Sequence, residues 1–177
     1  MHVHMTWQRY RSVAAVLAVM LLAILSGCPR GQEEKGARNK SASAVETVKA
    51  YCDLDAQAAR LTSETWGRVR PYIAWEEEAG WDRTVVISGY AVKEVKKRSD
   101  TAETVIVEYH VLGILSGDYL SSRRTETVKF TLRKTDLGWK ITAPDFMPPH
   151  VLLQPLLKHL EETKNLELAD KLKGAEG

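Results

Sequence analysis

The pattern of apolar and polar positions divides the chain into an apolar start, a polar connection and a region with regular periods. Residues 12–26 contain no charge, whereas residues 28–42 are mostly small or polar and show no apolar period. Such a composition is typical of a flexible linker. We therefore predict a tether over residues 28–42 and a folded domain that begins near residue 43.

The first periodic segment is helical. Ser43 and Glu46 fit a capping box, which marks a helix start. Apolar residues then recur at helical spacing, at Ala44, Val45, Val48, Tyr51, Cys52, Ala58 and Ala59. This predicts an amphipathic helix over residues 44–60, followed by a short helix that ends near Pro71.

From residue 84 the period changes to that of strands. Four segments alternate in the manner of half-buried strands, namely residues 84–97, 102–115, 119–134 and 138–144. Tight turns between them predict an antiparallel sheet. After Pro149 the spacing of apolar residues predicts a helix that opens at Pro155. The polar composition of residues 166–177 predicts a polar tail that frays. The fold class is α+β, with N-terminal helices packed on a curved antiparallel sheet of about four strands and a C-terminal helix.

One turn predicts a strand register. Gly117 and Asp118 suit a two-residue type II′ hairpin, which pairs Ser116 with Tyr119. Four further pairs follow from this register: Val111 with Arg124, Tyr109 with Glu126, Val107 with Val128, and Val105 with Phe130. The apolar faces of both strands coincide under it, and a slip by one residue would destroy the match.

The charges at the start of the chain change the interpretation of the apolar run. Arg9 and Arg11 precede it, and no acidic residue does. A basic start, an apolar run of about 15 residues and a small-residue end define a secretory signal peptide, and a bilayer span needs about 20 residues. The run ends in Leu25-Ser26-Gly27-Cys28, which resembles the lipobox of bacterial lipoproteins.

That resemblance implies a lipid on the Cys28 sulfur and cleavage before Cys28, so that residues 1–27 are a lipoprotein signal peptide. The mature protein would be held on a membrane of the cell envelope and face the periplasm or the exterior. An ordinary signal peptide or a single-span anchor is the alternative.

The chain has 25 basic residues, of which two precede Cys28, and 23 acidic ones. The mature chain is thus formally neutral, and we expect no nucleic acid as a partner. Cys52 then has no internal thiol partner and is expected to be a small core residue.

The order of elements carries a second resemblance. Helices first, then a curved antiparallel sheet whose last strand is "TDLGWKI", resemble the nuclear transport factor 2-like superfamily, also called cystatin-like. The resemblance implies a cone-shaped α+β domain, over residues 43–165, that often encloses a pocket. The superfamily includes ketosteroid isomerase, dehydratases and non-catalytic domains, and a fold by itself does not choose among these functions.

Four residues are candidates for a pocket in that cone. Asp55 interrupts the apolar stripe of the first helix, where a carboxylate would be placed to act as a general base; capping or kinking the helix is the alternative. Arg124 and Glu126 share strand parity with the core face, and Glu126 lies opposite Tyr109. The two charged residues would form a polar pocket mouth, unless the strand twists into solvent there.

No cofactor motif, metal motif or Ser-His-Asp order is present, and His150 and His159 stand isolated in the sequence. The first hypothesis is therefore a non-catalytic envelope domain that binds a small ligand or a protein. The alternatives are a lipid-anchored isomerase- or dehydratase-like enzyme that uses Asp55 with Tyr109, and a structural accessory subunit of an envelope complex.

Overall fold

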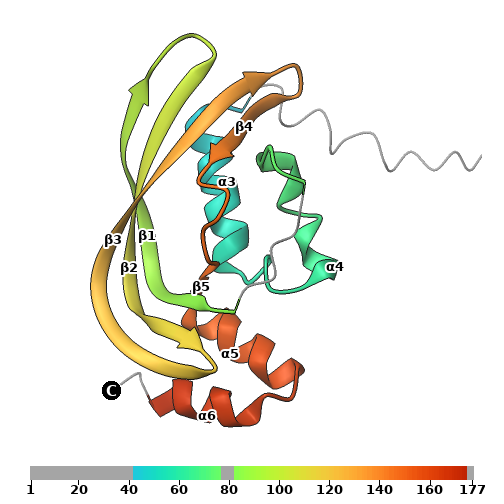
Figure 1. The fold of residues 1–177 in the computed structure, drawn as a ribbon, viewed down its shortest axis with the longest axis vertical. Coiled ribbons are helices and arrows are strands. Elements are labelled where there is room, and N and C mark those ends of the chain that lie inside the picture. Colours follow the sequence, from blue (N-terminus) through green and yellow to red (C-terminus); the bar gives the residue numbers. More distant parts are fainter. Residues whose placement is uncertain (1–41, 77–81, 175–177) are drawn as a thin grey trace, which may run out of the picture. The chain divides into compact units, whose positions relative to one another are not determined.

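The computed structural model describes residues 42–76 and 82–174, all within one compact unit, Arg38–Gly177. The predicted signal peptide, Cys28 and nearly all of the tether lie outside the described residues. The predicted α+β class is confirmed: a helix lies on a curled five-stranded sheet, and two helices follow it (Figure 1). The sheet forms a half-barrel, because its strands coil around the first helix.

The first helix, α3 (Ala44–Ala56), begins at the predicted capping box. Glu46 accepts from the Ser43 N–H at 2.6 Å, and the Ser43 hydroxyl oxygen accepts from the Glu46 N–H at 3.2 Å. The helix ends before the predicted residue 60, since Ala58 turns into the left-handed region with φ 64°. Two short helices follow, α4 (Ser63–Trp66) and η2 (Arg70–Tyr72).

The sheet has the order β4-β3-β2-β1-β5. Its strands are β1 (Thr84–Lys97), β2 (Ala102–Ser116), β3 (Asp118–Thr135), β4 (Gly138–Ala143) and β5 (His150–Leu152). The first four pair antiparallel, as the turns predict. β5 pairs parallel to β1 and was not predicted, because a three-residue strand is too short to show an alternating pattern.

The predicted register of β2 and β3 is confirmed in the core and wrong at the turn. Val105 pairs with Phe130, Val107 with Val128, Tyr109 with Glu126 and Val111 with Arg124. At the turn, however, Ser116 pairs with Asp118 rather than with Tyr119. A bulge between Val111 and Gly113 absorbs the difference of one residue.

The two faces of the sheet bury two separate cores. Neighbouring residues of a strand point to opposite faces, and on β1 Val85 packs in the α3 core while Val86 packs in the C-terminal core. The sheet residues of the α3 core are Val85, Ile87, Val105, Val107, Tyr109, Val111, Phe130, Leu132, Trp139 and Ile141. The buried residues of the C-terminal core are Val86, Leu115, Val151, Leu156, Leu157, Leu160, Ala169 and Leu172.

The C-terminal end corrects one prediction. In place of a polar tail from residue 166, the chain forms α6 (Leu166–Lys173) after α5 (Leu153–Glu162). Ala169 and Leu172 are fully buried, because their spacing of three places both on one helical face, toward the C-terminal core. Pro155 lies in the first turn of α5, where its missing N–H breaks no helical hydrogen bond.

The curl of the sheet brings β5 toward β3. These strands are separated by β2 and β1, so a flat sheet would hold them about 14 Å apart. Yet the ring of His150 lies 3.4 Å from the carboxylate of Glu126. His150 pairs with Val85, which points into the α3 core, and its side chain therefore faces the same interior. This curl creates the polar site described next.

Candidate functional site

A group of polar side chains lies inside the α3 core, and we call it the polar cluster. Five of its members are at most 2% exposed, and two more are partly exposed at its outer end. The buried members are Tyr51, Asp55, Arg60, Tyr109 and His150, and the outer members are Arg124 and Glu126. They come from α3, the turn after it, β2, β3 and β5.

Arg60 holds one end of the polar cluster. Its Nη1 donates to the Tyr51 hydroxyl at 2.8 Å and lies 3.5 Å from Asp55 Oδ2. Its Nη2 donates to the carbonyl of Met147 at 2.7 Å. The guanidinium thus ties the end of α3 to the segment that precedes β5, and it places a cation beside a buried carboxylate.

Asp55 is 0% exposed. Burial raises the pKa of this carboxyl group, because removal from water disfavours the charged form; Arg60 and the N–H of His150 oppose that rise. The His150 N–H donates to Asp55 Oδ2 at 3.0 Å, while Asp55 Oδ1 has no hydrogen-bond partner among the described residues. Asp55 therefore connects α3 to the first residue of β5.

His150 is the centre of the polar cluster. Its Nδ1 lies 2.9 Å from the carbonyl oxygen of Pro148, and a carbonyl only accepts hydrogen bonds, so Nδ1 carries a proton. In the neutral ring the lone pair is then on Nε2, which lies 3.4 Å from Glu126 Oε1. Burial lowers the pKa of His150, and the charges of Asp55 and Glu126 oppose that shift.

Tyr109 packs against this ring with the two ring planes tilted by 34°. The ring centroids of Tyr109 and His150 are 4.3 Å apart, and the Tyr109 hydroxyl lies 3.1 Å from the Cys52 sulfur. Burial raises the pKa values of Tyr109 and of Cys52, so both groups stay protonated near neutral pH. Cys52 is 1% exposed, which confirms that it is a core residue.

The outer end of the polar cluster reaches the surface. Arg124 Nη2 donates to Glu126 Oε2 at 2.9 Å, and the two side chains are 37% and 31% exposed. The other carboxylate oxygen of Glu126 faces His150. A chain of contacts thus leads from solvent-accessible Arg124 through Glu126 to the buried imidazole.

The four residues that the sequence proposes all belong to this cluster, and His150 joins them. Its backbone contacts Asp55, and its ring contacts Tyr109 and Glu126. Sequence reasoning missed Arg60, which is the last residue of the predicted helix, and His150, which precedes the helix predicted to open at Pro155. The only available signal was the short apolar stretch around residues 150–153, which follows two prolines.

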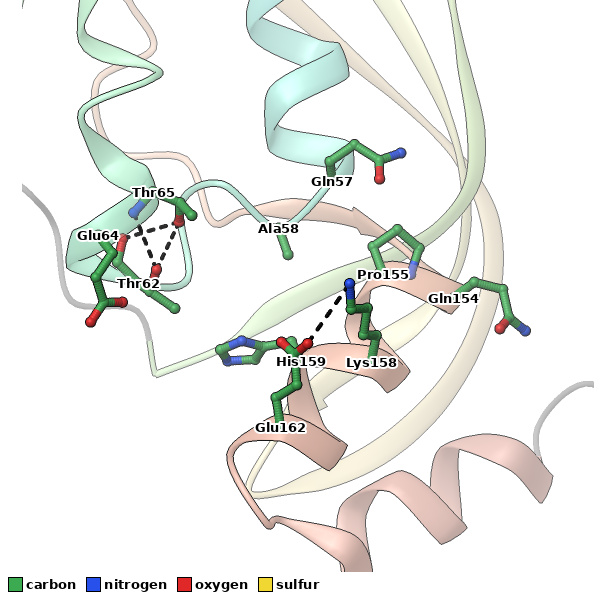
Figure 2. A pocket seen from close by; sticks show the side chains of 10 residues that line it. All are labelled: Gln57, Ala58, Thr62, Glu64, Thr65, Gln154, Pro155, Lys158, His159 and Glu162. Atoms are coloured by element: carbon green, nitrogen blue, oxygen red, sulfur yellow. Dashed lines mark hydrogen bonds and ion pairs between the residues drawn. The ribbon is translucent and has the colours of Figure 1, made fainter.

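A second feature is a groove of about 790 Å³ at the far end of α3 from the capping box (Figure 2). The residues that line it are mostly of polar types, although their apolar atoms supply much of the surface, and they include both charge signs: Gln57, Ala58, Thr62, Glu64, Thr65, Gln154, Pro155, Lys158, His159 and Glu162. These residues come from the end of α3, the start of α4 and one face of α5. None of them belongs to the polar cluster.

Comparisons with family models, with curated protein sequences and with solved structures each gave no match. Within residues 42–76 and 82–174, no three His, Cys, Asp or Glu side chains come together as a metal site requires. No helix in those ranges is long and apolar enough to cross a membrane. The site's own geometry is therefore the basis for a functional proposal.

Proposed function

We propose that this chain is a lipid-anchored protein of the bacterial envelope, whose domain resembles the nuclear transport factor 2-like superfamily and binds a partner without catalysis. The lipobox-like end of residues 25–28 supports the anchor. The observation that carries the binding role is the burial of the polar cluster. Asp55 and His150 are 0% exposed, so neither side chain is open to a substrate from solvent.

The groove at the end of α3 is the site that we assign to binding. The exposed side-chain amide of Gln57 carries both donors and an acceptor on this wall, while Lys158 and Glu162 pair with each other at 3.7 Å. A wall of this kind suits a polar ligand of low net charge, or a short segment of an envelope protein.

Native mass spectrometry of the full-length protein, purified from membranes, tests the groove. We expect a bound species on the wild-type chain that Gln57→Trp removes, because an indole at this position would fill the groove. Lys96→Trp is the matched control, since Lys96 is exposed on β1, away from the groove. A bound species that survives Gln57→Trp, or no bound species on any variant, would contradict the assignment.

The anchor has its own test. Cys28→Ser should leave the chain at its unprocessed mass or release it from the membrane fraction, because a lipidated cysteine is the attachment point that we propose. Fractionation and intact-mass measurement distinguish these results. Unchanged mass together with unchanged membrane retention would remove the lipoprotein assignment.

An acid–base enzyme is the second candidate. The observation that favours it is the contact of two carboxylates with one histidine: Asp55 accepts from the backbone N–H of His150, and Glu126 lies 3.4 Å from its ring. Groups with shifted pKa values often mark catalytic sites. The same mass measurement separates the candidates, because an enzyme would convert its bound species during incubation at 25 °C while a binding protein would return it unchanged.

A further inference from the structure

The N-terminal part of β3 is an open edge of the sheet. β4 pairs with β3 only over Thr131–Thr135, so residues 118–130 have no strand neighbour on that side in the part of the chain that the structure describes. Figure 1 shows this stretch running along the outside of the curl. Its backbone N–H and C=O groups on that side are available to another strand.

The other edges of the sheet are guarded. β4 has six residues and β5 has three, and short edge strands offer little to a partner. The part of β1 beyond β5 is broken by register shifts and carries Lys93, Lys96 and Lys97, which are two of the usual devices against edge pairing. By contrast, β3 keeps an unbroken register against β2 from Arg124 to Phe130.

Two charges on this edge limit what can pair with it. Arg124 and Glu126 are two residues apart and point into the curl, where they form an ion pair of 2.9 Å. Inward-pointing charges protect an edge against indiscriminate pairing, because like charges or apolar groups placed opposite them are unfavourable. A suitable partner strand must therefore offer an acid opposite Arg124 and a base opposite Glu126.

We propose that a second copy of this chain is that partner, with the two β3 edges paired antiparallel and Thr125 of each copy opposite Thr125 of the other. Arg124 of each copy then lies opposite Glu126 of the other, and a two-fold axis relates the two strands. A register centred on Arg124 or on Glu126 would instead place like charges face to face. The chain thus complements itself in one register.

The residues around the axis support this pairing. Thr125 and Thr127 are exposed, and β-branched side chains favour strands, while directly opposed threonines stabilise an antiparallel pair. The bulge on β3 at residues 122 and 123 ends the regular stretch, which keeps the contact short. A short contact is weak in solution and is strengthened where a common membrane raises the effective concentration; only this strength, and not the register, rests on the proposed anchor.

Disulfide trapping tests the register. In the proposed pairing, Thr125→Cys brings two thiols face to face, with Cα atoms about 4.5–5.5 Å apart, within the range that a disulfide spans. Thr127→Cys is the matched control on the same strand and face. Its two copies would lie four positions apart along the strands, about 14 Å, which is too far for a disulfide. The native Cys52 is buried and does not compete.

Membranes that carry the full-length variants are oxidised, and the oxidation is repeated on purified protein with Cys28→Ser. The second preparation tests the dimer even if the proposed lipid anchor is wrong. We expect a covalent dimer with Thr125→Cys, at least about tenfold more abundant than with Thr127→Cys, given the distances above. Adding Arg124→Glu to Thr125→Cys should reduce the dimer, and adding Glu126→Arg as well should restore it. No dimer at position 125 in either preparation, equal trapping at both positions, or a cross-link to a different protein would overturn the proposal.

Discussion

The buried pair of Asp55 and Arg60 offers the sharpest test of how the polar cluster stabilises the fold. Arg60→Met keeps most of the apolar stem of the side chain and removes the charge. The variant loses the hydrogen bonds of Arg60 to the Tyr51 hydroxyl and the Met147 carbonyl. It also leaves Asp55, which is 0% exposed, without its cation.

The expected loss follows from the charge of Asp55. Breaking a buried ion pair by removing one partner costs about 3–5 kcal/mol. Asp55 can limit the loss by taking up a proton, which at pH 7 costs about 4 kcal/mol for a carboxyl group whose unfolded pKa is about 3.9. We therefore expect Arg60→Met to lower the free energy of unfolding at pH 7 by about 3–5 kcal/mol. That is a large part of the roughly 5–15 kcal/mol that stabilises a typical domain.

The loss should depend on pH in a defined direction. In the variant, the folded pKa of Asp55 lies above the unfolded value, so stability falls as pH rises past the unfolded pKa. At pH 4.5 the proton costs only about 1 kcal/mol, so the difference between variant and wild type should shrink. Burial already raises the pKa of Asp55 in the wild type, so this decrease should be smaller than about 3 kcal/mol. Adding Asp55→Asn to Arg60→Met removes the last buried charge of the pair and should recover about 2 kcal/mol at pH 7.

Urea unfolding followed by tryptophan fluorescence measures these energies, because Trp66 and Trp139 are buried and report on the α3 core. The control is Arg68→Met. Arg68 precedes β1 in the sequence, as Arg60 does, but it is exposed, so its loss should change stability by less than about 0.5 kcal/mol. A loss below about 1 kcal/mol for Arg60→Met, or the same loss at pH 7 and pH 4.5, would refute the assignment of a charged, stabilising pair.

Three further predictions concern other parts of the fold and use the same unfolding assay. Gly113→Ala should cost about 1–3 kcal/mol, because an added Cβ would lie 2.6 Å from the Leu120 carbonyl oxygen and the Tyr119 ring; unchanged stability would mean that the bulge beside Gly113 yields freely. Leu172→Ala should cost about 2–5 kcal/mol, since Leu172 is 0% exposed in the C-terminal core, and a loss under about 0.5 kcal/mol would show that α6 does not stabilise the domain. Burial lowers the pKa of His150 below the usual histidine value of about 6.5, so the wild-type protein should lose stability as pH falls from 7 through that value toward the folded pKa. His150→Phe should lose less stability between pH 7 and pH 5, and an equal loss would argue against a buried neutral imidazole.

The strands show how far local pattern reaches. The alternation of apolar residues in β2 and β3, together with the glycine at 117, predicted which residues pair in the core. The turn register was wrong by one residue, because a bulge costs little and has no signature in the alternation. β5 was not predicted, because its three residues form a strand only by pairing with β1, which is distant in the sequence.

The sequence by itself determined the α+β class, the start of α3, the antiparallel meander and the candidates Asp55, Tyr109, Arg124 and Glu126. Each of these depends on neighbours within one element or one hairpin, where periodicity is decisive. Only the tertiary structure decided that His150 joins the four candidates, that Arg60 faces Asp55, and that α6 packs on the second core. These contacts join segments as much as 95 residues apart, and they exist because the sheet curls, a property of the whole set of strands that no local pattern records.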